Sequence, residues 1–141
     1  MYSNKLKDKA WKTFAKFIKL RDSLATTGRL NFCRCITCGN KTYTVLIDAG
    51  HCLKGRHNAI LFDERATNGQ CQYCNRTLGG QYPVYEVAIG AKYGVDVLNE
   101  IKDLNKTTVK YSDADYLAKI DYYNKKIELI YNCYKKNEYR S

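Results

Sequence analysis

The chain has 141 residues, with 24 Lys and Arg against 14 Asp and Glu, a formal net charge of +10 and seven cysteines. This length suits one small domain with helical extensions, and it excludes large two-domain enzymes and cofactor folds that need a wide parallel sheet. Hydrophobic residues make up 45% of the chain, which excludes a disordered basic tail.

Membrane and export signals are not found in the sequence. No apolar run approaches the roughly 18 residues that span a bilayer, and residues 1–30 lack the pattern of a signal peptide. We therefore expect a cytoplasmic protein with no membrane partner. In that compartment disulfides are disfavoured, so clustered cysteines are expected to hold metal.

The excess positive charge is concentrated toward the N-terminus. Residues 1–30 contribute +6 and residues 31–80 contribute +3, so nine of the ten excess charges lie in the first 80 residues. A local excess of this kind favours a polyanionic partner, of which nucleic acid is the commonest. A merely solvated basic surface is the alternative.

A basic helix is predicted over residues 4–24, within an N-terminal unit of residues 1–30. Apolar residues recur at three- and four-residue steps, and Gly28 marks the end. The helix packs on the domain with a solvated basic face, or uses that face to follow phosphates; a membrane-surface helix is a third interpretation. The candidate phosphate contacts are Lys12, Lys16, Lys19 and Arg21.

Residues 31–80 form the predicted core, which contains six of the seven cysteines and both histidines. β-Branched and aromatic residues predict a strand over residues 42–47. A loop is expected over residues 50–58. Residues 71–80 predict a turn and a short helix, closed by Gly79 and Gly80.

Two more units complete the chain. Residues 81–111 form a helical extension: Pro83 suits the first turn of a helix that reaches about residue 93, Gly94 breaks it, and Asp96 starts another. A polar loop follows over residues 105–111. Ser112 and Asp115 form a capping-box variant that begins the last helix, within residues 112–141.

The last helix carries an apolar stripe with the spacing of a heptad seam and one polar Asn. The stripe covers under three heptads, which favours packing on the chain's own domain. A two-fold helical dimer contact is the alternative. The stripe consists of Leu117, Ile120, Asn124, Ile127, Tyr131 and Tyr134.

Two Cys-x-x-Cys pairs predict a metal site. Cys35 and Cys38 form the first pair, and Cys71 and Cys74 form the second, with 32 residues between them. Each pair can bind one ion from a tight turn, and two such turns give the tetrahedral four-cysteine site that suits zinc. Reduced structural cysteines are the alternative.

Three cysteines are left without a role. Cys33 could compete with Cys35, but the spacing favours Cys35. Cys52 and Cys133 are isolated and are expected to be small buried or surface thiols. A structural zinc would hold a functional site rigid in a small chain, because metal binding adds to the free energy of folding.

A polar cluster lies between and around the cysteine pairs. Asp48 and His51 follow the predicted strand, and Asn68 and Asn75 flank the second pair. A His can act as general base on water, and a carboxylate with an amide oxygen can bind Mg²⁺. Such an ion can stabilise the leaving oxygen and the charge that develops on the phosphoryl group. The set suits hydrolysis of phosphodiesters, although each residue alone is more often structural.

Several motifs resemble the NinG (Rap) family of phage recombination nucleases: WKTFAKFIKLRD, CITCG, DAGH and NGQCQYCNRTLGG, then Tyr85 and Lys92-Tyr93-Gly94. The resemblance covers roughly residues 11–104. This family is similar in turn to the HNH, or ββα-metal, nucleases. The resemblance implies an α+β fold, mostly helical overall, with a small zinc-stabilised treble-clef core and flanking α-helices. It also implies Mg²⁺- or Mn²⁺-dependent cutting of branched DNA, such as Holliday junctions and D-loops, in phage recombination.

The resemblance assigns roles to the polar cluster. His51 would be the general base, Asn75 would bind the catalytic metal, and Asn68 would hold the His loop or orient His51. One position departs from the pattern, because many HNH enzymes have a metal-binding Asp directly before the His, where this chain has Gly50. Asp48 would take that role by a different backbone path.

The remaining expectations concern partners. Lys54, Arg56 and Arg76 are placed to meet phosphates beside the cleaved bond, or form a solvated surface, and His57 is a reserve ligand or base.

Paired cuts across a branch need two sites, so we expect a homodimer, with recombination proteins as further partners. The second hypothesis is a non-catalytic zinc module that binds DNA or recruits a partner, which would not require a His in that loop.

Overall fold

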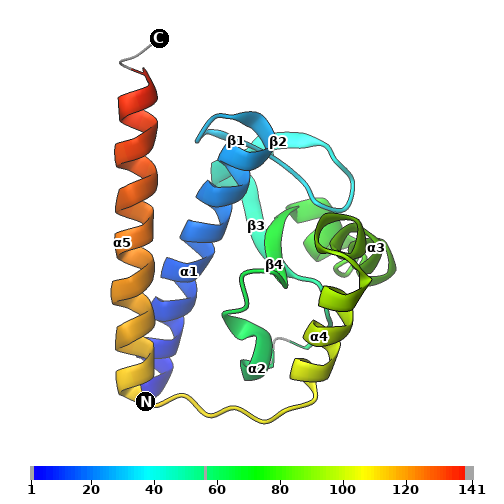
Figure 1. Cartoon of the computed structure of the whole chain (residues 1–141), viewed down its shortest axis with the longest axis vertical. Coiled ribbons are helices and arrows are strands. Elements are labelled where there is room, and N and C mark those ends of the chain that lie inside the picture. Colours follow the sequence, from blue (N-terminus) through cyan, green and yellow to red (C-terminus); the bar gives the residue numbers. More distant parts are fainter. Residues whose placement is uncertain (1, 56, 139–141) are drawn as a thin grey trace.

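Two long helices stand side by side along one edge of the molecule, and the smaller elements pack on the other side of the first (Figure 1). The structure is a computed structural model that describes residues 2–55 and 57–138; Arg56, one of the predicted phosphate contacts, lies outside the described residues. The helices and strands are α1 (Tyr2–Thr27), β1 (Phe32–Arg34), β2 (Lys41–Tyr43), η1 (Thr44–Leu46), β3 (Ile47–His51), α2 (Asn58–Leu61), β4 (Thr67–Cys71), η2 (Tyr73–Thr77), α3 (Tyr82–Tyr93), α4 (Val95–Asn105) and α5 (Asp113–Glu138).

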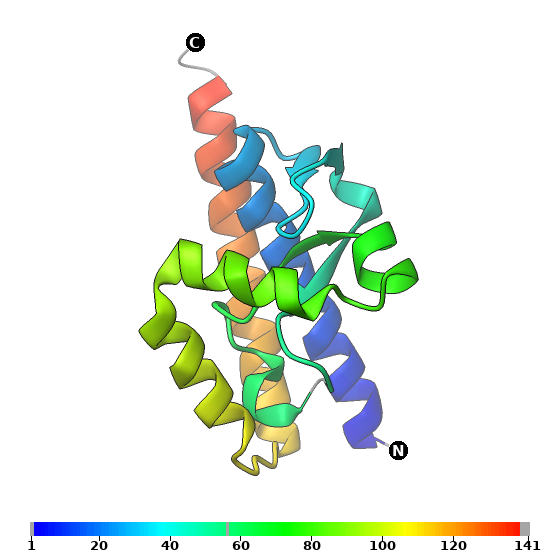
Figure 2. The same ribbon diagram turned by 90° about the vertical axis from the view of Figure 1, so that its right-hand side faces the viewer.

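The chain is therefore mostly helical, with two small antiparallel sheets. β1 pairs with β2, and β3 pairs with β4. Helices α3 and α4 lie on the far side of these strands from α5, and α2 lies below β4 in the view of Figure 1; Figure 2 shows α3 and α4 from the side that faces away from α5. Among the described residues, no helix combines the length and the hydropathy that a membrane span needs.

Helix α1 confirms the predicted N-terminal helix and extends it at both ends. Its apolar stripe is buried, with Ala10, Phe14 and Ile18 fully inaccessible. Gly28 ends the helix at a φ of +73°, where its N–H donates to the Leu24 carbonyl at 2.9 Å. Glycine adopts this left-handed conformation without steric cost, which makes it a common helix terminator.

The single strand predicted over residues 42–47 is divided in two, because the chain kinks at Thr44. β2 ends at Tyr43, η1 covers Thr44–Leu46, and a new strand, β3, begins at Ile47. The Thr44 hydroxyl shares a hydrogen bond of 2.7 Å with Ser23 of α1, and its N–H donates to the Asn31 carbonyl at 2.9 Å. These contacts fix the kink. Because β3 extends to His51, the loop predicted over residues 50–58 begins only after that residue.

The pairing of β3 with β4 sets the two faces of the second sheet. Asp48 lies opposite Gln70 and Gly50 lies opposite Asn68. Because side chains alternate along a strand, these four positions share one face. The other face packs against α1. The strand pair thus carries polar residues on the side that meets η2 and α3.

Helix α5 begins at the predicted capping box. The Ser112 N–H donates to the Asp115 carboxylate at 2.8 Å, and the Asp115 N–H donates to the Ser112 hydroxyl at 3.1 Å. These reciprocal bonds satisfy two backbone donors that the first helical turn leaves unpaired.

The apolar stripe of α5 packs on α1, as the sequence favoured, but its register differs from the predicted seam. Ile120 and Ile127 are buried, whereas Leu117 is 52% exposed and Asn124 is exposed. Tyr116 and Tyr123 are buried in the seam; the Tyr123 ring lies 4.9 Å from Phe14 and 5.2 Å from Phe17 between centroids. Because these large rings fill the contact, Leu117 is turned outward.

We expect Ile120→Ala to lower the free energy of unfolding by about 2–5 kcal/mol, because it removes a buried side chain and leaves a cavity. Leu117→Ala, from the same predicted stripe, is the matched control and should stay within about 0.5 kcal/mol of wild type. Urea unfolding of both variants with metal bound measures the difference. Equal losses would show that α5 does not pack in this register.

Candidate active site and metal centre

Four cysteines form one cluster. The Sγ atoms of Cys35, Cys38, Cys71 and Cys74 all lie within 4.8 Å of one another, and those of Cys38 and Cys71 are 3.8 Å apart. Sulfurs arranged as a tetrahedron at the Zn–S distance of about 2.3 Å would be separated by about 3.8 Å. The cluster can therefore hold a structural metal such as zinc, and it contains Cys35 rather than Cys33.

Local backbone bonds shape the two halves of this cluster. In the first half the Cys35 N–H donates to the Asn40 carbonyl and the Gly39 N–H donates to the Cys35 carbonyl, both at 2.9 Å. In the second half the Cys74 N–H points to the Cys71 sulfur at 3.4 Å. The first half follows β1 and the second joins β4 to η2. A bound metal would therefore tie the first sheet to the second.

The other cysteines lie outside the cluster. Cys33 and Cys52 are buried and Cys133 is exposed on α5. Burial raises the pKa of the Cys52 thiol to about 12, so Cys52 stays protonated at neutral pH. Cys52 and Cys133 are thus a buried and a surface thiol, as expected, and Cys33 is a buried thiol outside the metal cluster.

A cavity of about 490 Å³ brings together Asp48, His51 and Asn75. β3 contributes Asp48 and His51, and η2 contributes Asn75. The wall on the α1 side includes Trp11 and two basic residues. The other lining residues are Lys12, Ala15, Lys19, Ala49, Gly50, Leu53, Gly55, Arg76 and Tyr82. Three of the four predicted catalytic residues thus share one cavity.

His51 is held firmly in this cavity. Its ring is stacked on Trp11, with centroids 5.1 Å apart and an interplanar angle of 26°, and only 7% of the residue is exposed. Its Nε2 lies 3.1 Å from the carbonyl oxygen of Leu61. A carbonyl can only accept, so Nε2 carries the proton and the lone pair of the neutral ring is on Nδ1. This tautomer is suited to a general base.

Asp48, Asn75 and Arg76 form a hydrogen-bonded group. The Asp48 carboxylate accepts a bond from the Asn75 side-chain amide at 2.9 Å and two bonds from the Arg76 guanidinium, each at 2.9 Å. Arg76 itself is 63% exposed. The guanidinium balances the charge of the partly buried carboxylate, which also accepts the Asn75 bond, so three side chains are held together in this group.

Asn68 does not reach the cavity. It is 1% exposed and lies opposite Gly50 in the strand pair. Its side-chain oxygen accepts a bond from Lys92 at 2.9 Å, and its amide nitrogen donates to the Arg65 carbonyl at 3.2 Å. Asn68 therefore acts within the scaffold that holds the strand before His51, not beside the ring of His51.

Arg21 is also directed inward. Its guanidinium donates to the carbonyls of Glu64 and Thr67, at 2.7 and 2.8 Å, and to the carboxylate of Asp22 at 2.8 Å. Asp22 in turn accepts the Gly69 N–H at 2.7 Å. This network fastens β4 to α1, and it removes Arg21 from the candidate phosphate contacts.

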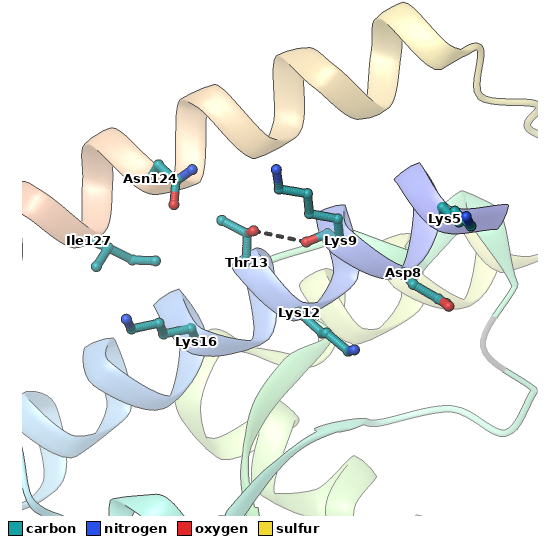
Figure 3. Close-up of a pocket in the computed structure, with 8 residues that line it drawn as sticks. All are labelled: Lys5, Asp8, Lys9, Lys12, Thr13, Lys16, Asn124 and Ile127. Atoms are coloured by element: carbon teal, nitrogen blue, oxygen red, sulfur yellow. Dashed lines mark hydrogen bonds between the residues drawn. The ribbon is translucent and has the colours of Figure 1, made fainter. Parts of the chain in front are cut away.

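The lysines of α1 remain on the surface. A groove of about 500 Å³ between α1 and α5 is lined by Lys5, Asp8, Lys9, Lys12, Thr13, Lys16, Asn124 and Ile127 (Figure 3). In Figure 3 Lys9 points toward α5, whereas Lys12 points away from it. Lys12 lines both this groove and the cavity of His51, and Lys19 lines the cavity. Lys54 is exposed beside the cavity residues Leu53 and Gly55.

Two residues that position the site were not assigned this role from the sequence. Trp11 supplies the ring beneath His51, and Tyr85, fully buried in α3, donates its hydroxyl to the Gly50 carbonyl at 2.5 Å. Both lie in the motifs that carry the family resemblance, which was the only signal for them. His57 is exposed and does not line the cavity.

We expect Cys71→Ser to lose the bound metal and the cooperative thermal unfolding transition, because a four-thiolate site contributes directly to folding. Cys133→Ser, an exposed cysteine outside the cluster, is the matched control. Elemental analysis should find about one zinc per chain in wild type and in the control. A Cys71→Ser protein that melts like wild type would contradict a structural metal.

Comparison with known families gives one match across most of the chain. The model of the family described as Bacteriophage Lambda NinG protein matches residues 2–132. The match is wider than the resemblance carried by the motifs, because it includes α1 from its start and most of α5. Comparisons with curated proteins and with solved structures give no match. A match to this family suggests a role related to phage recombination. Because the match covers most of the chain, the chain belongs to the NinG family.

Proposed function

We propose that this protein is a structure-specific endonuclease that cuts branched DNA, such as Holliday junctions and D-loops, during phage recombination. The observation that supports this most is the cavity in which Asp48, His51 and Asn75 meet beside lysines of α1. A module that only binds DNA needs no general base there. Family membership supports the link to recombination.

The chemistry would be hydrolysis of a phosphodiester. His51 would take a proton from the attacking water on Nδ1, while Nε2 keeps its bond to the Leu61 carbonyl. Asp48 and Asn75 offer oxygen atoms, the ligands that Mg²⁺ and Mn²⁺ prefer, so these residues fit a divalent ion. A bound ion would stabilise the leaving oxygen and the developing charge. Arg76 would be freed from Asp48 to meet the phosphate.

The metal and the fold of the core would follow from the cysteine cluster. The four-cysteine cluster would hold zinc, because four thiolates in a tetrahedral arrangement suit that ion. β3, β4 and η2 would then be the two strands and the helix of a treble-clef, HNH-like core. The five-residue η2 is short for this role, and the zinc would fix it at the end of β4.

DNA would approach along α1. The exposed Lys12 and Lys16 lie on the groove between α1 and α5, and Lys12 continues into the cavity. Lys19 and Lys54 would extend this basic path around the scissile phosphate. Nucleic acid backbones are bound in this way by rows of basic side chains.

We also propose that the protein acts as a homodimer. Two active sites are needed for paired cuts across a branch, which favours a homodimer. Ile120 and Ile127 are already buried against α1, so the dimer contact would use another face of α5 or another surface. Recombination proteins are the expected partners, in the cytoplasm of the host cell.

We expect His51→Gln to lower the rate of cutting of a labelled four-way junction, with Mg²⁺ or Mn²⁺, by about 10²–10⁴-fold. Losing a positioned general base has an effect of this size. The glutamine amide can keep the bond to the Leu61 carbonyl but offers no basic nitrogen. His57→Gln is the matched control and should cut like wild type.

Zinc content and melting temperature of both variants show whether the fold is kept. A His51→Gln protein that cuts as fast as wild type would rule out the proposed mechanism. A folded wild type that binds the junction but cuts it with neither ion would favour the non-catalytic zinc module.

We expect the double variant Lys12→Ala, Lys16→Ala to bind junction DNA more weakly and with a reduced dependence on salt. Each phosphate interaction that the variant removes should lower the slope of log K against log salt by about one. Lys135→Ala, Lys136→Ala removes the same charge from the far end of α5 and should leave the slope unchanged. Identical slopes for both double variants would contradict the proposed path along α1.

A further inference from the structure

Gln70 is a buried polar residue with an unusual contact pattern. It is fully buried in β4, and its amide nitrogen donates to the Gly80 carbonyl at 2.8 Å and approaches the Thr37 hydroxyl at 3.3 Å. Its Oε1 atom is buried with no hydrogen-bond partner among the described residues. The Gly80 carbonyl can only accept, so the nitrogen must face Gly80 and the oxygen must face the other way.

This oxygen is aimed at Gly50. A Cβ atom built on Gly50 would collide with Gln70 Oε1, and it would lie 3.2 Å from Asn75 Oδ1. Two amide oxygens from different elements therefore converge on the place where residue 50 lacks a side chain. Gly50 and Asn75 both line the cavity of His51, so the oxygens converge at its wall.

A carboxylate completes the group. Asp48 lies directly opposite Gln70 in the strand pair, so the two side chains leave the sheet on the same face. Asp48 is also bonded to Asn75, through the amide nitrogen at 2.9 Å. Because the amide nitrogen of Asn75 faces Asp48, its Oδ1 atom faces Gly50. The two amide oxygens of Gln70 and Asn75 thus lie beside Gly50, and the Asp48 carboxylate lies on the same face of the strand pair, next to the amide nitrogen of Asn75.

We propose that Gln70 Oε1 is a ligand of the divalent metal ion, together with Asn75 Oδ1 and the Asp48 carboxylate. This inference rests on the proposed function in one respect, that a divalent ion binds in this cavity. Hard cations take amide and carboxylate oxygens together. Gln70 supplies, from the neighbouring strand, the oxygen that Gly50 cannot provide.

The proposal accounts for two features at once. A buried acceptor without a partner is destabilising, and a bound cation that accepts its lone pair removes that cost. The glycine at position 50 is also explained, because any side chain there would displace the Gln70 oxygen. Its carbonyl is fixed by Tyr85, which keeps the strand in place beside the oxygens.

The test is a titration of the zinc-loaded full chain with Mn²⁺ alone, followed by the electron paramagnetic resonance signal of the free ion. Wild type should bind one Mn²⁺, and Gln70→Met, which keeps the length of the side chain without the oxygen, should bind it at least about tenfold more weakly. Gln72→Met, the same change two residues further on, is the matched control and should bind like wild type.

Gly50→Ala provides a second variant that keeps Gln70 itself. The added methyl group pushes the Gln70 oxygen aside, so binding of Mn²⁺ should also weaken about tenfold or more. This variant decides the matter if Gln70→Met fails to retain zinc. A Gln70→Met protein that retains zinc and binds Mn²⁺ like wild type would overturn the proposal, and so would a wild type that binds no Mn²⁺.

The same proteins separate this inference from the nuclease proposal. If wild type cuts junctions and needs His51, but Gln70→Met binds Mn²⁺ like wild type, the role of Gln70 is wrong and the nuclease stands. If Mn²⁺ binding depends on Gln70 but wild type does not cut, the metal ligand stands and the nuclease is wrong.

Discussion

The antiparallel pairing of β3 with β4 is the interaction on which the rest of the structure depends. Its register places Asp48 opposite Gln70 and Gly50 opposite Asn68, and it ends where Cys71 begins the second half of the metal cluster. A shift of β4 by one residue relative to β3 would turn every side chain of β4 to the other face of the sheet. The same ladder therefore fixes the candidate active site and the candidate metal centre relative to each other.

Helix α1 has two tasks that meet at this strand pair. Its inward face fastens β4 through Arg21 and Asp22 and supplies the Trp11 ring on which His51 is stacked. Its outward face carries the lysines that line the groove beside α5. Because both faces belong to one rigid helix, a phosphate bound by Lys12 would be held at a fixed position relative to His51.

The charges and hydrogen bonds at the cavity wall would be rearranged if a divalent ion bound there. Asp48 is compensated by Arg76, whose guanidinium is mostly exposed, and the Gln70 oxygen has no hydrogen-bond partner among the described residues. A divalent ion in this place would satisfy the oxygen and compete with Arg76 for the carboxylate. The protein residues would then exchange partners without a change of backbone, since β3 is held by its ladder and by Tyr85.

The sequence by itself determined the features that depend on a few adjacent residues: the helix over residues 4–24, the capping box at Ser112, and the two Cys-x-x-Cys turns. It also singled out Asp48, His51 and Asn75 as candidate site residues, and the structure places all three at one cavity. Only the tertiary structure decided that the chain kinks at Thr44, that Arg21 and Asn68 serve the scaffold, and that the seam of α5 excludes Leu117. The physical reason is that spacing and capping are local, whereas the direction of a side chain depends on which distant segments pack against it. Gln70 shows the difference most clearly, because only the folded chain shows that its oxygen is buried without a hydrogen-bond partner next to Gly50 and Asn75.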